Sequence, residues 1–170
     1  PWITETSSVI DCGSGPGTIA CDIAMRTRRG HVVGVDADES EVRSATGLAA
    51  SRHIGNVRFR QASVYDLPFA DGEFDVAFAH ALLEHLSEPE RAVSELNRVL
   101  RPGGILGVSS PEWGGFILAP NTDDVAAAVE AYKAMQVRNG GDPLDGRKLG
   151  QLLESEGFRD IQMDARYEVY

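Results

Sequence analysis

The chain has 170 residues and a net charge of −10, and 42% of its residues are apolar and 25% charged. This mixture is typical of a globular domain with one sizeable core. The acidic balance argues against a nucleic-acid partner, because binding phosphates requires a basic surface. No apolar run reaches the roughly 18 residues that a membrane-spanning helix needs, so we expect no membrane partner.

The chain contains two cysteines, Cys12 and Cys21. Two cysteines make neither a disulfide framework nor, on their own, a zinc site, so we expect buried, reduced thiols and no metal centre. The first residues have neither the basic nor the apolar part of a signal peptide. Together these features predict a cytoplasmic location.

Short apolar runs alternate with helical patterns along the chain. We predict strands at 8–12, 31–36, 57–61, 74–79, 105–109 and 161–170, and helices at 18–28, 39–53, 88–100, 122–138 and 147–156. This alternation predicts an α/β fold, with a doubly wound, mostly parallel sheet flanked by helices on both faces. The run 57–61 alternates apolar and polar residues and is expected at a sheet edge.

The loop after the first strand is the first candidate site, because ligands of such sheets bind beyond the carboxyl ends of the strands. Residues 11–17 read DCGSGPG, and a helix begins near Thr18. The three glycines allow a sharp turn and a close approach of a ligand to the main chain, and the helix start points amide groups into the site. Their spacing departs from the dinucleotide fingerprint G-x-G-x-x-G, and Asp11 would repel a pyrophosphate. Alone, the loop predicts no more than a tight turn.

Asp36 ends the second predicted strand, 19 residues after Gly17. A carboxylate at this position can accept hydrogen bonds from both hydroxyls of a ribose. The alternative is an aspartate that caps the next helix or lies on the surface. Dinucleotide and S-adenosylmethionine sites share this arrangement, so Asp36 indicates an adenosine ligand without choosing between them.

Residues 9–17, VIDCGSGPG, resemble motif I of the class I S-adenosylmethionine-dependent methyltransferases, and residues 33–36, VGVD, resemble the family's motif with the ribose-binding acid. Further stretches similar to the family's adenine border, fourth strand with its H-x-L-E-H-type segment, and turn before strand five lie at 61–69, 74–86 and 98–104. The matches follow one another in the family's order over roughly residues 8–110. Their nearest resemblance is to the ubiquinone and menaquinone biosynthesis methyltransferases.

The resemblance implies a Rossmann-like methyltransferase fold of six or seven strands. It implies one domain over residues 1–170, in which 111–145 form an insertion on the acceptor side. The expected activity is in-line transfer of a methyl group from S-adenosylmethionine to a small organic molecule, which leaves S-adenosylhomocysteine. Trp113, Phe116 and Tyr132 are expected to line the acceptor pocket, with the alternative that Trp113 and Phe116 cover the sheet edge.

Carried over position by position, the resemblance assigns cofactor-binding roles to Asp11, Gly13, Ser14, Gly15, Asp36, Ala37, Ser63, Val64 and His80. The first four hold the methionine part of the cofactor, the next two hold the ribose and lie against adenine, and Ser63 and Val64 border the adenine edge. The family often has aspartate where Ser63 stands. Serine can still accept a hydrogen bond, at a cost of about 1 kcal/mol.

His80 is expected at the methionine end, near the transferred methyl group, and is the candidate catalytic residue. A general base is needed only when the acceptor must lose a proton, and histidine can serve near neutral pH. Glu84 and His85 also follow the fourth strand. We interpret both as residues that fix the loop by hydrogen bonds.

Two other functions compete with methyl transfer. The first is a non-catalytic module that binds S-adenosylmethionine, an alternative that Ser63 keeps open. The second is an NAD(P)-binding oxidoreductase, against which the glycine spacing and Asp11 argue.

Overall fold

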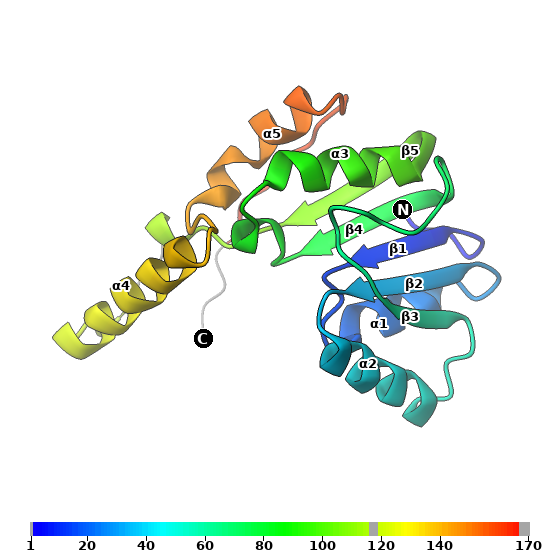
Figure 1. The fold of residues 1–170 in the computed structure, drawn as a ribbon, viewed down its shortest axis with the longest axis horizontal. Helices are drawn as coiled ribbons and strands as arrows, with labels where there is room; N and C mark the ends of the chain where they lie inside the picture. The colour runs from blue at the N-terminus through cyan, green and yellow to red at the C-terminus, as the bar shows by residue number, and fades with distance from the viewer. Residues whose placement is uncertain (1, 116–118, 167–170) are drawn as a thin grey trace.

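The computed structural model describes residues 2–115 and 119–166. Within them lies one sheet of five strands in the order β3-β2-β1-β4-β5, and every neighbouring pair is parallel (Figure 1). The strands are β1 Ser8–Cys12, β2 His31–Asp36, β3 Val57–Gln61, β4 Phe74–His80 and β5 Leu100–Ser109. The order reverses between β1 and β4, which makes their carboxyl ends the switch point of the sheet.

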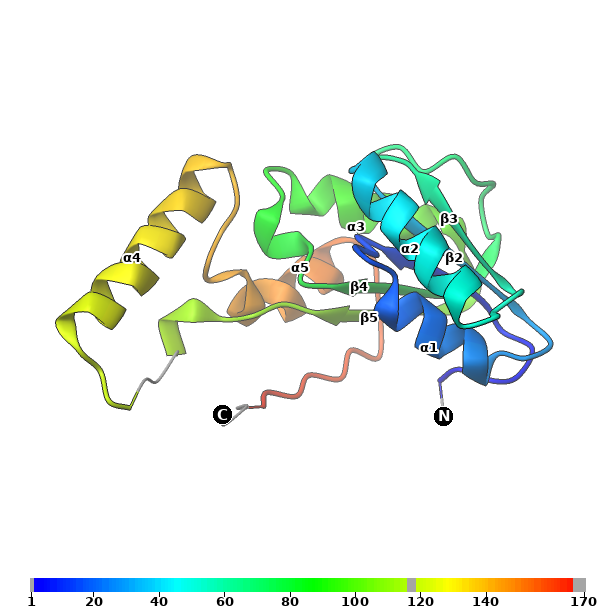
Figure 2. The same ribbon diagram turned by 90° about the horizontal axis from the view of Figure 1, so that it is seen from below.

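Helices cover both faces of the sheet, which confirms the doubly wound prediction (Figure 2). The α-helices are α1 Thr18–Arg26, α2 Glu39–Ser51, α3 Pro89–Val99, α4 Asp123–Arg138 and α5 Leu149–Ser155. Three short 3-10 turns are η1 Leu83–His85, η2 Trp113–Gly115 and η3 Asp145–Lys148. Buried residues of α1 and α2 form one apolar core, and those of α3 and α5 form the other. None of the described helices is long and apolar enough to cross a membrane.

The burial of the strands explains their sequence patterns. In β1, Val9 faces one core and Ile10 the other, and both are fully buried, so adjacent residues of the strand are apolar instead of alternating with polar ones. The alternating strand β3 lies at the edge of the sheet, as predicted. The helix cap predicted at Thr122 is also present, because its hydroxyl accepts a hydrogen bond from the Val125 amide at 3.4 Å.

The predicted sixth strand at 161–170 is wrong for the part that the structure describes. Residues 161–166 have no strand structure, and five of these six side chains are exposed. An alternating pattern makes a strand only when a neighbour supplies ladder hydrogen bonds and a surface for one face. Residues 167–170 lie outside the described residues. The described sheet therefore has fewer strands than the six or seven expected.

The fifth strand begins earlier than predicted. The breakers at 101–104 end helix α3, but β5 already starts at Leu100, which pairs with Phe74. The register then shifts, and the regular ladder resumes at Ile105. Gly103 has φ +76°, so the interruption is a local irregularity within the strand rather than a loop before it.

The last glycine of the loop is required by packing. Gly17 has φ +82°, and a Cβ there would lie 2.6 Å from the Ala45 Cβ of α2 and 2.7 Å from the Phe59 Cζ of β3. Distances this short are repulsive. Gly17 therefore allows the loop, α2 and β3 to meet, which sets the position of the loop above the sheet.

We expect Gly17→Ala to destabilise the protein by roughly 2 kcal/mol or more, because it combines a strained φ with overpacking. Gly47→Ala is the matched control, since this glycine lies in the exposed middle of α2 with no atom within 4 Å of its added Cβ. Removing a glycine from a helix should stabilise by about 0.5–1 kcal/mol. Urea unfolding measures both changes, and shifts of the same sign would contradict this packing account.

Candidate functional site

The register of the sheet gathers the predicted site residues at one edge. Cys12 of β1 pairs with Val35 of β2 on one side and with Ala79 of β4 on the other. Asp36 and His80 are the last residues of β2 and β4 and directly follow Val35 and Ala79, and the glycine loop directly follows Cys12, so all three begin at the same edge of the sheet. In Figure 1 the arrowheads of these strands point toward the side where α4 lies. The predicted site thus lies at the switch point of the sheet.

Most of the amides of the glycine loop donate hydrogen bonds to the end of β2. The amides of Gly13 and Ser14 both donate to the Val35 carbonyl, at 2.9 and 3.0 Å, and the Gly17 amide donates to the Ser14 carbonyl at 2.9 Å. The Gly15 amide donates to Asp36 Oδ2 at 2.9 Å. These four loop amides are therefore bonded within the protein, and they are distinct from the amides at the start of α1 that were expected to point into the site. A pyrophosphate would need such donors free, so their engagement argues against a dinucleotide.

Gly15 is the open point of the loop. It has φ +48°, and no atom lies within 4 Å of the position that a Cβ would occupy. A Cβ at Gly13, by contrast, would lie 3.0 Å from Leu82 Cδ1. A ligand can therefore approach the main chain at Gly15, with Leu82 packed over the neighbouring part of the loop.

Asp36 ties the glycine loop to the start of α2. Its Oδ2 accepts from Gly15, and its Oδ1 accepts from the Asp38 amide at 3.0 Å. The residue that caps α2 is Asp38, whose side chain accepts from the Ser40 amide at 2.7 Å. Each carboxylate oxygen of Asp36 retains lone pairs for another donor, as binding a ribose hydroxyl requires.

Asp11 is a buried carboxylate that the protein leaves partly unsatisfied. The residue is 2% exposed, and Oδ2 has no hydrogen-bond partner among the described residues. Burial, followed by repulsion from Asp36, raises the pKa of Asp11 to about 7, although the Ala20 amide lowers it. The buried hydroxyl of Ser14 also has no partner. Buried polar atoms without partners are rare in proteins and are a sign of a ligand site.

These two atoms fit the amino-acid end of S-adenosylmethionine. An ammonium group would complement the Asp11 carboxylate, and the Ser14 hydroxyl can either donate or accept a hydrogen bond. The observed chemistry of the loop therefore favours a cationic amino-acid ligand over a phosphate.

The predicted adenine-side residues differ in their exposure to solvent. Ala37 and Ser63 are exposed. The Ala37 carbonyl accepts from Gln61 Nε2 at 2.9 Å, and the Ser63 hydroxyl accepts from the Tyr65 amide at 3.2 Å. The Val64 side chain, however, is buried in the core. Val64 can therefore contribute only main-chain atoms to a nucleoside site.

His80 is the exposed last residue of β4, opposite Ser109 in the register. Its ring stacks on that of Phe78, with centroids 6.4 Å apart and an interplanar angle of 21°. Leu82, two residues further on, packs against the glycine loop at Gly13, a contact that the sequence reasoning missed. Its position directly after the fourth strand was the available signal, but an apolar residue there reads equally well as part of the core.

Glu84 fixes the loop after β4, as interpreted from the sequence. Its side chain is 1% exposed and accepts from the Ser110 hydroxyl at 2.8 Å. Its main-chain carbonyl accepts from Gln136 Nε2 and from the Asp142 amide, both at 2.9 Å. These bonds attach the end of α4 and the loop after it to the core. His85 is half-exposed, and its Nε2 lies 3.8 Å from Glu84 Oε1.

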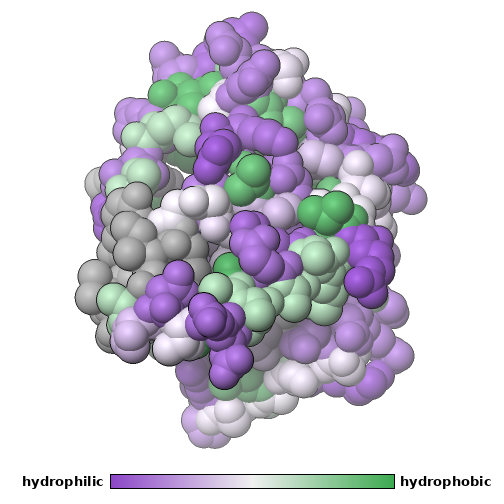
Figure 3. All heavy atoms as spheres, turned by 90° about the vertical axis from the view of Figure 1, so that its left-hand side faces the viewer, coloured by the Kyte–Doolittle hydropathy of each residue, from purple (hydrophilic) through white to green (hydrophobic). Residues whose placement is uncertain are grey.

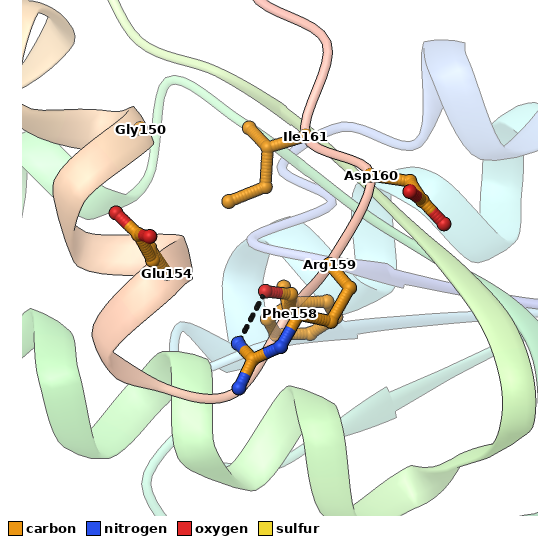
Figure 4. Close-up of a pocket in the computed structure, with 6 residues that line it drawn as sticks. All are labelled: Gly150, Glu154, Phe158, Arg159, Asp160 and Ile161. Atoms are coloured by element: carbon orange, nitrogen blue, oxygen red, sulfur yellow. Dashed lines mark hydrogen bonds between the residues drawn. The ribbon is translucent and has the colours of Figure 1, made fainter.

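The acceptor-side aromatic residues are only partly described. The rings of Trp113 and Tyr132 are in contact, with centroids 4.7 Å apart. Phe116 lies outside the described residues. A pocket of about 440 Å³ lies elsewhere, beside the end of α5 (Figure 4). It is lined by Gly150, Glu154, Phe158, Arg159, Asp160 and Ile161, none of which was a predicted site residue.

In the part of the chain that the structure describes, no three His, Cys, Asp or Glu side chains form a group that could hold a metal ion. Cys12 and Cys21 are both buried and free, as predicted.

The chain is similar to known methyltransferases. The Methyltransferase domain family matches residues 10–108, more than half of the chain. An uncharacterised methyltransferase of Schizosaccharomyces pombe is 30% identical, over 98% of this chain and 58% of its own length. The O-methyltransferase resE of Aspergillus sclerotiorum is 30% identical, over 91% of this chain and 55% of its own length. The chain thus spans little more than half the length of these relatives.

The solved structure of PKMT2 from Rickettsia typhi in complex with AdoHcy is 27% identical, with a TM-score of 0.57, and the match covers 61% of this chain and 21% of that one. The narrower resemblance to the ubiquinone and menaquinone enzymes stays a prediction, because these relatives carry other names. The motif order, the sheet topology and the family match agree on the broader assignment. The chain belongs to the class I S-adenosylmethionine-dependent methyltransferases, and its cofactor is S-adenosylmethionine.

Proposed function

We propose that this domain transfers the methyl group of S-adenosylmethionine to a small organic acceptor at the carboxyl edge of β1 and β4. The observation that carries the proposal is Asp11, a buried carboxylate with one oxygen left without a partner. A protein tolerates such a group where a ligand completes it. A cationic amino-acid end is the complement that this loop lacks.

The chain's own residues divide the work of holding the cofactor. Ionised Asp11 and the hydroxyl of Ser14 face the amino-acid end, and Gly13 and Gly15 let it approach the main chain. Asp36 accepts the ribose hydroxyls, while Ala37, Ser63 and the main chain of Val64 border the adenine. When bound, the cofactor supplies an electrophilic methyl group on a sulfonium. The rate then depends on how closely the site aligns the acceptor with that group.

His80 is placed to serve the acceptor. It follows Ala79, the partner of Cys12, and therefore stands beside the glycine loop with an exposed ring. The relative resE is named an O-methyltransferase, which favours an oxygen acceptor here. A hydroxyl must lose its proton during transfer, and an exposed imidazole can accept it. Glu84 is unsuited to this role, because it is buried and bonded to Ser110.

Residues 111–145 form the acceptor side of one domain that comprises residues 1–170. The described residues of this segment, 111–115 and 119–145, extend beyond the carboxyl ends of the strands, and α4 exposes Val125, Met135 and Val137. From that side, apolar residues interrupt a mostly polar surface (Figure 3). Such a surface, with the paired rings of Trp113 and Tyr132, suits a partly apolar organic molecule. The net charge of −10 argues against a polyanionic acceptor.

A domain that binds the cofactor without methyl transfer is the alternative function. Methyl transfer and cofactor binding without transfer are distinguished by screening labelled S-adenosylmethionine against small phenols, alcohols and carboxylic acids. Transfer of label to an organic product supports the proposal, whereas cofactor binding without any transfer favours the binding module. The buried free thiols Cys12 and Cys21 further favour a reducing compartment, and we propose the cytoplasm.

Asp11→Asn tests the residue that carries the proposal. Because folding raises the Asp11 pKa from 3.8 to about 7, the folded protein binds a proton that the unfolded chain releases, and stability falls as pH rises through this window. The variant should therefore be more stable than the wild type at pH 8, by a few kcal/mol at most, with little advantage at pH 4. Thermal unfolding at both pH values measures this.

The same variant should bind S-adenosylhomocysteine more weakly at pH 8, because it lacks the charge that complements the ammonium group. In the wild type, affinity should fall by up to about tenfold per pH unit below pH 7, as Asp11 takes up its proton. Asp164→Asn, an exposed aspartate, is the control and should change neither stability nor binding. An Asp11→Asn protein that binds as tightly as the wild type would exclude this role.

Asp36→Ala should weaken binding of S-adenosylhomocysteine about 100-fold or more, because two hydrogen bonds to a charged group are lost. Asp38→Ala, two residues away, should cost about 1 kcal/mol of stability through the lost helix cap but leave binding intact. Calorimetry measures both affinities. Equal binding by the two variants would rule out the ribose role of Asp36.

His80→Gln should lower kcat for a hydroxyl acceptor about 100-fold, because general base catalysis contributes on that order, and should weaken binding of S-adenosylhomocysteine by a much smaller factor. His31→Gln is the matched control, since this histidine lies at the opposite end of the sheet. Single-turnover transfer of labelled methyl measures the chemical step. Unchanged turnover in His80→Gln would show that no base is supplied at this position.

A further inference from the structure

The loop between β3 and β4 carries the predicted adenine edge but has almost no regular structure of its own. Residues 62–73 contain only an isolated bridge between Ser63 and Asp66, in which the Asp66 amide donates to the Ser63 carbonyl at 3.1 Å. In Figure 1 this loop runs from β3 across the sheet toward α3. Main-chain groups in such a segment need partners from outside it.

A single arginine on α3 supplies those partners. Arg98 Nη2 donates to the Leu67 carbonyl at 2.9 Å, and Nη1 donates to the Phe69 carbonyl and to Asp71 Oδ1, both at 2.8 Å. The planar guanidinium thus bonds three points of one loop at once. Lysine has no equivalent fork of donors.

Glu95, one turn earlier on α3, completes the arrangement. Its Oε1 accepts from the Leu67 amide and from Arg98 Nη2, both at 2.7 Å, and its Oε2 accepts from Arg98 Nε at 2.9 Å. The Arg98 side chain is 32% exposed and that of Glu95 15%. Leu67 therefore has both its amide and its carbonyl held by this pair, which we name the α3 clamp.

Leu67, the residue that the α3 clamp holds, directly follows the adenine-side turn in the chain. The turn between Ser63 and Asp66 closes immediately before Leu67, and the side chains of Val64 and Leu67 both enter the core. Fixing Leu67 therefore fixes the end of the turn that exposes Ser63. Neither residue of the clamp was among the predicted site residues.

We propose that the α3 clamp, Glu95 with Arg98, is a positioning device that sets the selectivity of the cofactor site for adenine. It acts through the Ser63–Asp66 turn rather than by touching the cofactor. The inference rests on the proposed role of Ser63 at the adenine edge. Because Ser63 lacks the charge of an aspartate, its contribution depends on being held in place, and preorganisation is the means by which a weak contact becomes selective.

The test compares binding of S-adenosylhomocysteine with that of S-inosylhomocysteine, in which an oxygen replaces the adenine amino group. The wild type should prefer the adenine ligand. Arg98→Met should weaken S-adenosylhomocysteine binding about tenfold and bring the ratio of the two affinities close to one, since ordering the loop would then have to accompany binding. Arg98→Lys should fall between the two.

Arg101→Met is the matched control, because Arg101 is an exposed arginine that pairs with Asp75 outside this loop. It should leave the ratio unchanged. If Arg98→Met does not fold, Glu95→Gln serves the same purpose, because it keeps an acceptor for Leu67 but removes the charge that holds Arg98. It should lower the ratio in the same direction.

A clamp variant that is less stable yet keeps the wild-type affinity ratio would overturn the proposal, because the clamp would then serve folding alone. A wild-type protein that binds both ligands equally would overturn it too, since no adenine selectivity would exist to be set. Either result leaves methyl transfer to be judged by the label-transfer screen. The positioning role and the proposed function can therefore be disproved independently of each other.

Discussion

The pairing of β1 with two parallel neighbours in one register determines where this protein can bind a ligand. Cys12 lies level with Val35 and Ala79, so β1, β2 and β4 reach the same edge of the sheet together. The chain leaves β1 through the glycine loop, whose first amides bond to the carbonyl of Val35. The adjacent acid, Asp36, then accepts the amide of Gly15. A shift of one residue in either pairing would separate the acid, the loop and the histidine.

The same edge contains a group that costs the fold stability. Asp11 lies in a strand that is buried on both faces, between the core residues Ile10 and Cys12, and is therefore buried whatever its chemistry. Burial and the nearby charge of Asp36 raise its pKa, so its ionised form is disfavoured in the free protein. Natural proteins depart from good packing chemistry mainly at functional sites. The loss of folding stability that a carboxylate causes here is thus evidence for a ligand that needs it.

Much of the fold could be predicted from periodicity and from residues that act locally. Strands β1 and β3 match their predicted bounds. The apolar run that ends at the glycines reflects a strand buried on both faces, and the alternating run reflects a strand at the sheet edge. Thr122 caps α4 as its side chain dictates. The segment 161–166 was misjudged, since whether an alternating run pairs depends on a neighbouring strand that its own sequence does not describe.

Site residues could be predicted from the sequence where few residue types can perform the required role. The glycines and Asp36 fall into this class, because few other residues fit a left-handed turn or accept from a ribose. Val64 and Arg98 do not. The sequence pattern around a valine is the same whether the valine faces the core, as Val64 does, or a ligand. An arginine on a helix is usually a solvated surface residue, and only the structure shows that Arg98 bonds to a distant loop.

The central claim is that the glycine loop and Asp36 hold S-adenosylmethionine, and a crystal structure with S-adenosylhomocysteine tests it most directly. The account predicts the ribose hydroxyls within hydrogen-bond distance of Asp36 and the ammonium group beside Asp11, with the ligand passing over Gly15. A ligand bound instead in the pocket beside Phe158, with Asp11 and Asp36 both free of contact, would contradict it.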